Sequence, residues 1–420
     1  MVNMALSAGL RALHHRDFRL FWTGQLVSLI GTWMQSVGQS WLVLELTNSP
    51  FRLGLIGALQ FGPILLFSFV AGAISDRARK RRLLLGTQSA LMLQAFTLTA
   101  LVWSGHVQFW HVAVLAALYG CATTLDIPTR QSYMANLVPR GDLMSAIALN
   151  SAVFNGARVV GPAAAGLLVA RYGTAVAFLL NGASFIAVIG ALAAIHTEGT
   201  PRPRSGRGMG AEIAEGVRYA LGTPRIAFVL GLLLSVSLFV VNMNVLVPLI
   251  ARNVLNEGAH GFGLLMATLG VGAVVGALAV AGLALGRPPL GLVVGPALAA
   301  AILLGLLSFV HRFGLAAAVL MAMGFAQIVF MTSCNTTVQI AAPDELRGRI
   351  MSLYALVFAG MTPIGSLLMG SIAERWGVAR ACLVGGSAGV LVVSGLALAW
   401  RHRRAGGGSS RRDRDLQPVP

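Results

Sequence analysis

Three charged side chains lie inside long apolar stretches of the sequence. Asp126 is the only one of the 14 acidic residues that falls deep within such a stretch, and Arg130 follows it one helical turn later. Arg158 lies inside the next apolar stretch. A charge in the middle of a membrane-spanning helix costs several kcal/mol, so it usually faces a partner or a water-filled cavity. These three residues are therefore the first functional candidates.

The chemistry open to this set depends on whether Asp126 stays ionised. Arg130 shares a helical face with Asp126, and a hairpin of two apolar helices would bring Arg158 to a similar depth. A carboxylate between two guanidinium groups stays charged, which favours a salt bridge that packs helices or changes with conformation. If the substrate or a conformational change releases Asp126, the carboxylate can instead carry a proton. Direct contact with a substrate is the third possibility.

Neutral polar and aromatic side chains form a second set of candidates for a substrate cavity. They are Trp33, Gln35, Gln39, Asn242, Asn244, Gln327, Ser333 and Asn335. A large apolar ligand is usually held by apolar walls with a few polar groups that fix its orientation. The same side chain types also form hydrogen bonds between membrane helices, so the sequence leaves both roles open for each residue.

A densely charged turn joins two other apolar stretches. It contains Gly72, Asp76, Arg77, Lys80 and Arg81, together with two more arginines. Such a turn must lie in water, and basic residues accumulate on the cytoplasmic side of membrane proteins. With this turn in the cytoplasm, basic residues favour that side by roughly four to one over the whole chain. Both termini are then cytoplasmic, and we expect anionic lipid at the basic clusters.

The composition is typical of a membrane protein. Hydrophobic residues make up 56% and charged residues 11% of the 420 residues, and the mean hydropathy is +0.77, so too little charge is present to cover a soluble surface. The net charge of +17 is spread over short clusters, which predicts no nucleic-acid partner. The three cysteines lie in apolar runs without metal-ligand spacing. We expect no metal, no cofactor, no catalytic residues and no enzyme activity.

The elements that position these residues are apolar stretches of about 20 residues, the length that crosses a bilayer. The predicted fold is an all-α polytopic membrane protein with twelve transmembrane helices in two six-helix parallel pseudo-repeats. The predicted segments are a cytoplasmic N-terminal segment (1–19), a first half (20–195), a cytoplasmic linker with an interfacial helix at 211–221 (196–224), a second half (225–400) and a disordered basic tail (401–420). The fourth span is expected to end near residue 137. The seventh and eleventh spans are expected at 225–250 and 350–373.

The two halves repeat one another at one constant offset. The matching positions are Pro139 and Pro343, Gly161 and Gly365, Gly166 and Gly370, Arg171-Tyr-Gly173 and Arg375-Trp-Gly377, and Gly182 and Gly386. An even number of spans in each half makes the repeats parallel, related by an axis along the membrane normal. A site between two such halves can be exposed alternately to the two sides when the halves rock.

Two six-span halves and the charged turn resemble the major facilitator superfamily. The pattern Gly-x-x-x-Asp-Arg-x-Gly-Arg-Arg/Lys of that family is met by Gly72, Asp76, Arg77, Lys80 and Arg81, with an arginine in place of its second glycine. Within the superfamily the chain is similar to the enterobactin and macrolide exporters. This likeness rests on the runs 31–35, 126–131, 146–150 and 155–162. Gly156, Gly161, Pro162 and Gly166 resemble the antiporter motif of the fifth span.

The resemblance implies a secondary active transporter that works by alternating access in the bacterial cell (inner) membrane. The expected function is proton-coupled export of a hydrophobic or amphipathic small molecule, such as a drug, a macrolide or a siderophore-like compound. The resemblance also implies that Asp76 caps the N-terminus of the eleventh span when the protein is closed on the inside. An uptake permease for a small metabolite and a non-transporting membrane receptor are the alternatives. We expect a monomer.

Overall fold

The computed structural model describes residues 10–199, 209–282, 288–343 and 346–406. Within these ranges every regular element is a helix, and ten helical segments are long and apolar enough to cross a membrane. The shorter apolar helix α12 and the first long helix, α2, lie at two further predicted spans. The all-α polytopic fold class is confirmed, whereas the number of twelve transmembrane helices stays a prediction.

The helices of the first half follow one another with short connections. They are α2 (Arg16–Thr47), α3 (Pro50–Arg77), α4 (Lys80–Trp103), α5 (Phe109–Met134), α6 (Leu143–Tyr172) and α7 (Ala175–Ala194), preceded by the short turn η1 (Arg11–His14) and, before α6, by η2 (Arg140–Asp142). The start of α3 has a clear local cause: the Ser49 side chain accepts a hydrogen bond from the backbone N–H of Arg52, and Pro50 occupies the first helical turn. The fourth span ends at Met134, three residues before the predicted boundary.

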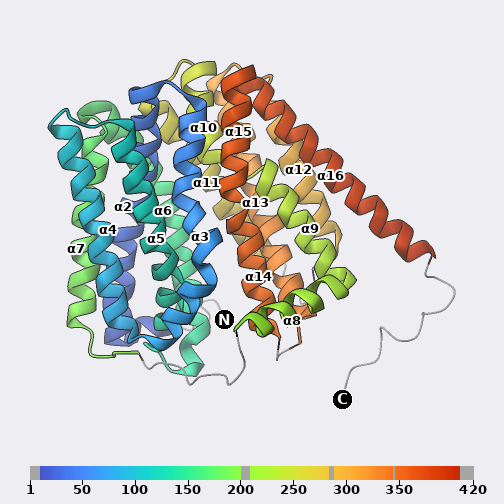
Figure 1. Cartoon of the computed structure of the whole chain (residues 1–420), viewed down its shortest axis with the longest axis horizontal. Helices are drawn as coiled ribbons and strands as arrows, with labels where there is room; N and C mark the ends of the chain where they lie inside the picture. Colours follow the sequence, from blue (N-terminus) through green and yellow to red (C-terminus); the bar gives the residue numbers. More distant parts are fainter. Residues whose placement is uncertain (1–9, 200–208, 283–287, 344–345, 407–420) are drawn as a thin grey trace.

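The helices of the second half lie beside those of the first, and α3 and α15 run side by side between the two groups (Figure 1). They are α8 (Met209–Gly222), α9 (Pro224–Phe239), α10 (Met243–Leu249), η3 (Ile250–Val254), α11 (Ala259–Gly282), α12 (Gly291–Leu307), α13 (Phe313–Ala341), α14 (Arg347–Gly360), α15 (Thr362–Trp376) and α16 (Val378–Gly406). Helix α8 is present where the interfacial helix was predicted. Residues 401–406 belong to α16, so the prediction that they are disordered is wrong; the rest of the tail lies outside the described residues.

The seventh and eleventh predicted spans are each broken, which corrects the prediction of continuous helices. The seventh is interrupted between α9 and α10, where the Asn242 side-chain amide donates to the carbonyl of Leu238 at 2.8 Å. That carbonyl is the one that the backbone N–H of Asn242 would use in a continuous helix. The eleventh is interrupted at Met361, and Pro363 follows in the first turn of α15. Proline removes a backbone donor, so the ladder of the preceding helix cannot continue through it.

The matching glycines of the two halves make matching contacts. A Cβ on Gly161 would lie 2.5 Å from the Cβ of Trp33 on α2, and one on Gly365 would lie 2.5 Å from the carbonyl oxygen of Leu238 on α9. In each half, the glycine therefore packs against the first long helix of its own half. Such close approach is possible because glycine has no side chain.

A second pair of matching glycines packs across the two halves. A Cβ on Gly166 would lie 2.8 Å from the Cα of Gly263 on α11, and one on Gly370 would lie 3.1 Å from the Cα of Gly54 on α3. These contacts join α6 to α11 and α15 to α3. They are the arrangement expected for two halves that repeat one another.

Candidate functional site

Asp126 lies in a buried polar cluster between α2, α4 and α5. Its side chain is 2% exposed. One carboxylate oxygen accepts hydrogen bonds from the Thr87 hydroxyl at 2.8 Å and from the Gln88 amide at 2.7 Å. The other lies 3.4 Å from Nε of Arg130, whose Nη1 donates to Oε1 of Gln25 at 2.7 Å. The predicted proximity of Asp126 and Arg130 is thus observed.

This cluster connects three helices through one ionisable group. Every donor that contacts Asp126 is positioned for a carboxylate, which accepts but does not donate when it is ionised. Protonation would remove the negative charge from the contact with Arg130. It would also add an O–H donor to Asp126, whose neighbours Thr87, Gln88 and Arg130 are all donors. The cluster can therefore hold α4 and α5 together when Asp126 is charged and loosen them when it is neutral.

Arg158 does not belong to the Asp126 cluster, in contrast to the expected carboxylate between two guanidinium groups. Its guanidinium carbon lies 5.9 Å from the ring centre of Trp33, and the Trp33 ring is 6.1 Å from that of Phe154 in an edge-on arrangement. Gln25 and Trp33, which contact the two arginines, are separated by about two turns of α2, on the order of 12 Å. The two arginines therefore contact α2 at different levels, and the expected similar depth of Arg158 and Asp126 is not observed.

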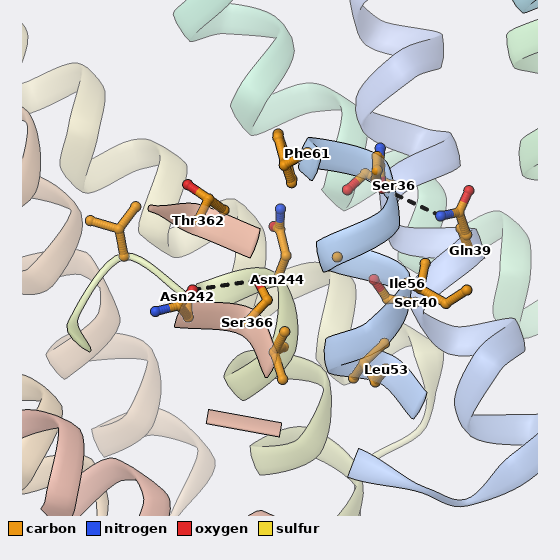
Figure 2. A pocket seen from close by; sticks show the side chains of 14 residues that line it. Ser36, Gln39, Ser40, Leu53, Ile56, Phe61, Asn242, Asn244, Thr362 and Ser366 are labelled. Carbon is orange, nitrogen blue, oxygen red and sulfur yellow. Dashed lines mark hydrogen bonds between the residues drawn. The ribbon is translucent and has the colours of Figure 1, made fainter. Parts of the chain in front are cut away.

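Three of the predicted cavity residues, Gln39, Asn242 and Asn244, line a small cavity between the two halves (Figure 2). Its volume is about 30 Å³, which is room for a water molecule and much less than a drug-sized ligand needs. The other lining residues come from α2, α3, α10, α15 and the α9–α10 break: Ser36, Ser40, Leu53, Ile56, Gly57, Gln60, Phe61, Val241, Val245, Thr362 and Ser366. None of these residues carries a charge.

The two broken helices meet at this cavity, a feature that sequence reasoning missed. Asn242 lies at the break between α9 and α10, and Thr362 is the first residue of α15. Ser366 connects the two breaks, since its hydroxyl lies 3.4 Å from Oδ1 of Asn242. Irregular backbone is tolerated at membrane depth where it is buried in protein or borders a polar cavity. The signals in the sequence were Asn242 itself and Pro363.

Gln35 lies in a buried network outside this cavity. Its amide donates to Oε1 of Gln94 on α4 at 2.9 Å, and its own oxygen accepts from the amide of Asn181 on α7 at 2.8 Å. This is the interhelical hydrogen bonding that the sequence left open as the second role. Gln327 and Ser333 are buried on α13, and Asn335 accepts a hydrogen bond from Gln339 one turn later at 2.5 Å. These α13 residues do not line the cavity between Gln39 and Asn242.

The basic residues of the charged turn are attached to the first half. Arg81 donates to the carbonyl oxygens of Leu192 and Ala193 at 2.6 and 2.7 Å, at the C-terminal end of α7. A cation is favourable there because the last carbonyls of a helix lack intrahelical partners. Lys80 is buried and donates to Oδ1 of Asn136 at 2.9 Å.

The beginning of the charged turn is open by contrast. Asp76 and Arg77 are exposed, and a Cβ on Gly72 would meet no atom within 4 Å. Asp76 forms no ion pair within the described ranges. The cap on the eleventh span that the resemblance implies for a protein closed on the inside is not formed in this conformation.

The two halves are in contact at the opposite end of α3. Glu374, near the end of α15, accepts hydrogen bonds from the Ser49 hydroxyl at 2.8 Å and from the backbone N–H of Phe51 at 3.0 Å. The glycine contacts of α3 with α15 and of α6 with α11 lie toward the same end, since Gly54 follows the start of α3 and Gly166 precedes the end of α6. A carboxylate from one half thus caps the first turn of a helix of the other half.

The arrangement of the helices and these contacts is the one expected of the major facilitator fold. The family model described as transmembrane secretion effector matches residues 7–412, and the chain belongs to this family of the major facilitator superfamily. The predicted family is therefore confirmed.

The chain is also similar to several bacterial transporters. It is 26% identical to the staphyloferrin A transporter of Staphylococcus aureus (strain NCTC 8325 / PS 47), over 86% of this chain and 91% of the relative. It is 28% identical to the multidrug efflux pump Tap of Mycobacterium tuberculosis (strain ATCC 25618 / H37Rv), over 84% and 86%. The enterobactin exporter EntS of Shigella boydii serotype 18 is 25% identical, over 85% of each chain. The family and these relatives are transporters, which agrees with the expectation that the chain is not an enzyme.

Among solved structures, that of the nucleoside transporter NupG matches 92% of this chain and 99% of its own, with a TM-score of 0.72 and 10% identity. At this identity the likeness concerns the fold alone.

Proposed function

We propose that this protein is a proton-coupled exporter of hydrophobic or amphipathic small molecules that works by alternating access. The observation that carries the proposal is the uneven contact between the halves. At one end Glu374 caps α3 and two glycine pairs touch, and at the other end Asp76 and Gly72 of the same helix lack such contacts. A transporter closed at one end only is one of the two states that alternating access requires.

The charge distribution supports an orientation for this state. The charged turn has five basic residues within the six positions 77–82, which favours the cytoplasmic side of the bacterial cell (inner) membrane for this end. The closed end then faces outward and the site faces the cytoplasm, where an exporter collects its substrate. The printed names of two relatives, a multidrug efflux pump and an enterobactin exporter, support export over uptake.

The Asp126 cluster supports proton coupling. Asp126 is buried, holds together contacts from α2, α4 and α5, and is ionisable. A proton that reaches it would weaken those contacts and change how the helices of the first half pack. Such a link between protonation and packing is what exchange of a proton for a substrate requires.

The proposal is tested with inside-out membrane vesicles that hold wild type, Asp126→Asn or Glu257→Gln. A panel of siderophores, macrolides and dyes is added outside, and accumulation is measured with the vesicle interior made acidic. We expect wild type and the control Glu257→Gln, which removes a carboxylate from the loop before α11, to accumulate at least one compound. Asp126→Asn should lose about tenfold or more of this accumulation, the size of a typical coupling between two sites.

Substrate exchange without a proton gradient distinguishes a loss of proton coupling from general damage to the protein. Asp126→Asn should still exchange labelled for unlabelled substrate across the membrane, because exchange needs no net proton movement. Full pH-driven accumulation by Asp126→Asn would contradict the coupling role. Accumulation only in right-side-out vesicles would favour the uptake permease, and no transport of any compound by wild type would contradict the exporter proposal.

A further inference from the structure

Arg158 lies far from both ends of α6, and no carboxylate partner for it is found in the described part of the chain. Asp126 and Arg130 neutralise each other, whereas the described ion pairs do not include Arg158. Its guanidinium donates no hydrogen bond within the same ranges, and the side chain is only partly exposed. An uncompensated cation at this depth is unfavourable unless something else pairs with it during the working cycle.

The aromatic contact of Arg158 leaves its hydrogen-bonding capacity free. The guanidinium carbon of Arg158 lies over the Trp33 ring, 5.9 Å from the ring centre. A contact between a cation and an aromatic face uses the positive charge but none of the five N–H donors. These donors lie in a planar fork that matches the two oxygens of a carboxylate. The contact with Trp33 therefore favours this position of the guanidinium without using its N–H donors.

This pair lies next to the cavity between the halves. Trp33, Ser36 and Ser40 recur at helical spacing, so they share one face of α2, and the two serines line the cavity. Trp33 is one turn closer to the start of α2, which is the end of the bundle where Asp76 is exposed. Phe154, one turn before Arg158 on α6, is 47% exposed and completes an aromatic surface beside Trp33.

We propose that Arg158 and Trp33 form an anion-binding subsite of the transporter. It would hold a carboxylate or another planar oxyanion of the substrate on the guanidinium fork, with the apolar part of the molecule against Trp33 and Phe154. The preferred substrates are then amphipathic organic anions. This inference rests on the proposed transport function and gives it a substrate class.

The test compares one ligand in charged and neutral form. Pyrenebutyric acid and its methyl ester have the same aromatic body, and only the acid is an anion at neutral pH. Binding of each to purified protein in lipid nanodiscs is measured by energy transfer from tryptophan to pyrene. We expect wild type to bind the acid roughly tenfold or more tightly than the ester, because truncating one partner of a buried charge pair has an effect of at least this size.

Variants test whether the preference for the acid over the ester depends on Arg158. Arg158→Gln should bind acid and ester equally, and Arg158→Lys should keep part of the preference because it retains the charge without the fork. The matched control is Arg171→Gln, since Arg171 also lies over an aromatic ring, at 5.7 Å from Tyr172, but at the exposed end of α6. It should retain the full preference.

Two outcomes would overturn the subsite: equal binding of acid and ester by wild type, or an undiminished preference in Arg158→Gln. Binding of the ester by Arg158→Gln shows that the variant is folded, so loss of acid binding cannot be attributed to collapse. Binding is measured without transport, so the result for the subsite does not depend on whether the exporter proposal holds in the vesicle experiment.

Discussion

At the scale of single residues, the buried polar side chains differ in what their bonds connect. Gln35 bridges Gln94 and Asn181, so its two amide atoms are used in contacts between three helices. Gln39 donates to Gln60 at 3.3 Å and borders a cavity. The first residue therefore contributes to stability, and the second has polar atoms beside a space with room for a water molecule.

Replacing Gln35 should lower stability and leave substrate affinity unchanged. Gln35→Met keeps the side chain length but leaves the Asn181 amide and the Gln94 oxygen without their partner. Each interhelical hydrogen bond of this kind is worth about 0.6 kcal/mol and at most about 1.7 kcal/mol in a membrane protein. The melting temperature of the purified protein in detergent should fall, while KM stays as in wild type. A raised KM with an unchanged melting temperature would place Gln35 in the substrate site instead.

At the scale of elements, α3 and α15 each carry an acidic residue, and the two residues lie at opposite ends of the pair: Asp76 on α3 and Glu374 on α15. Glu374 on α15 caps the start of α3 in this conformation. Asp76 lies at the far end of α3, and α14, which continues into α15, begins at that same end. The two caps cannot both be formed if closing one end opens the other. We therefore expect each cap to favour one of the two conformations.

Removing the Glu374 charge should shift the protein toward the conformation that is open at this end. A carboxylate at a helix N-terminus contributes about 0.3–1 kcal/mol, so Glu374→Gln should raise the open population roughly two- to fivefold. Spin labels on cysteines introduced at Phe51 and Arg375, two exposed positions beside the cap, would report this as a larger share of long distances. An unchanged distance distribution would show that Glu374 does not stabilise the closure.

The sequence predicted where the helices lie along the chain better than how each helix is placed against its neighbours. Long apolar stretches defined nearly all helices, and the i, i+4 spacing correctly paired Asp126 with Arg130. The spacing did not predict that Arg158 lies beside Trp33, because the sequence does not give the level and the rotation at which neighbouring helices meet. The breaks at Asn242 and before Pro363 were missed for a related reason. The apolar sequence continues through both breaks. The first coincides with the hydrogen bond of the Asn242 side chain to the Leu238 carbonyl, and the second with the missing backbone N–H of Pro363.

At the scale of the whole molecule, the two halves repeat in backbone and differ in charge. Gly161 and Gly365 pack on equivalent helices, as do Gly166 and Gly370. The counterpart of Asp126 at the repeat offset is Phe330, and that of Arg130 is Cys334. The first half therefore carries the ionisable groups, and the second half contributes broken helices and neutral polar side chains to the shared cavity.

Neutralising Asp76 should slow the transport cycle without preventing insertion. Asp76→Asn removes the cap that the resemblance implies for the state closed at the charged turn, so we expect that state to lose about 0.3–1 kcal/mol. We expect turnover to fall roughly two- to fivefold at an unchanged protein level in the membrane. Combining it with Glu374→Gln should restore part of the original balance, because the two changes act on opposite states. Turnover equal to wild type in Asp76→Asn would contradict the gating role.

The uncompensated charge of Arg158 has an electrical consequence. If the first half rocks, an empty carrier moves this positive charge through part of the membrane field, and a full crossing is worth about 2.3 kcal/mol per 100 mV. A potential that is negative inside would then draw the empty protein back to the state open to the cytoplasm. A bound anion would cancel the charge and make the loaded step insensitive to voltage. The membrane potential would thus drive the return of the carrier, the step in which the proton also moves inward, and would not act on the outward step with the bound anion.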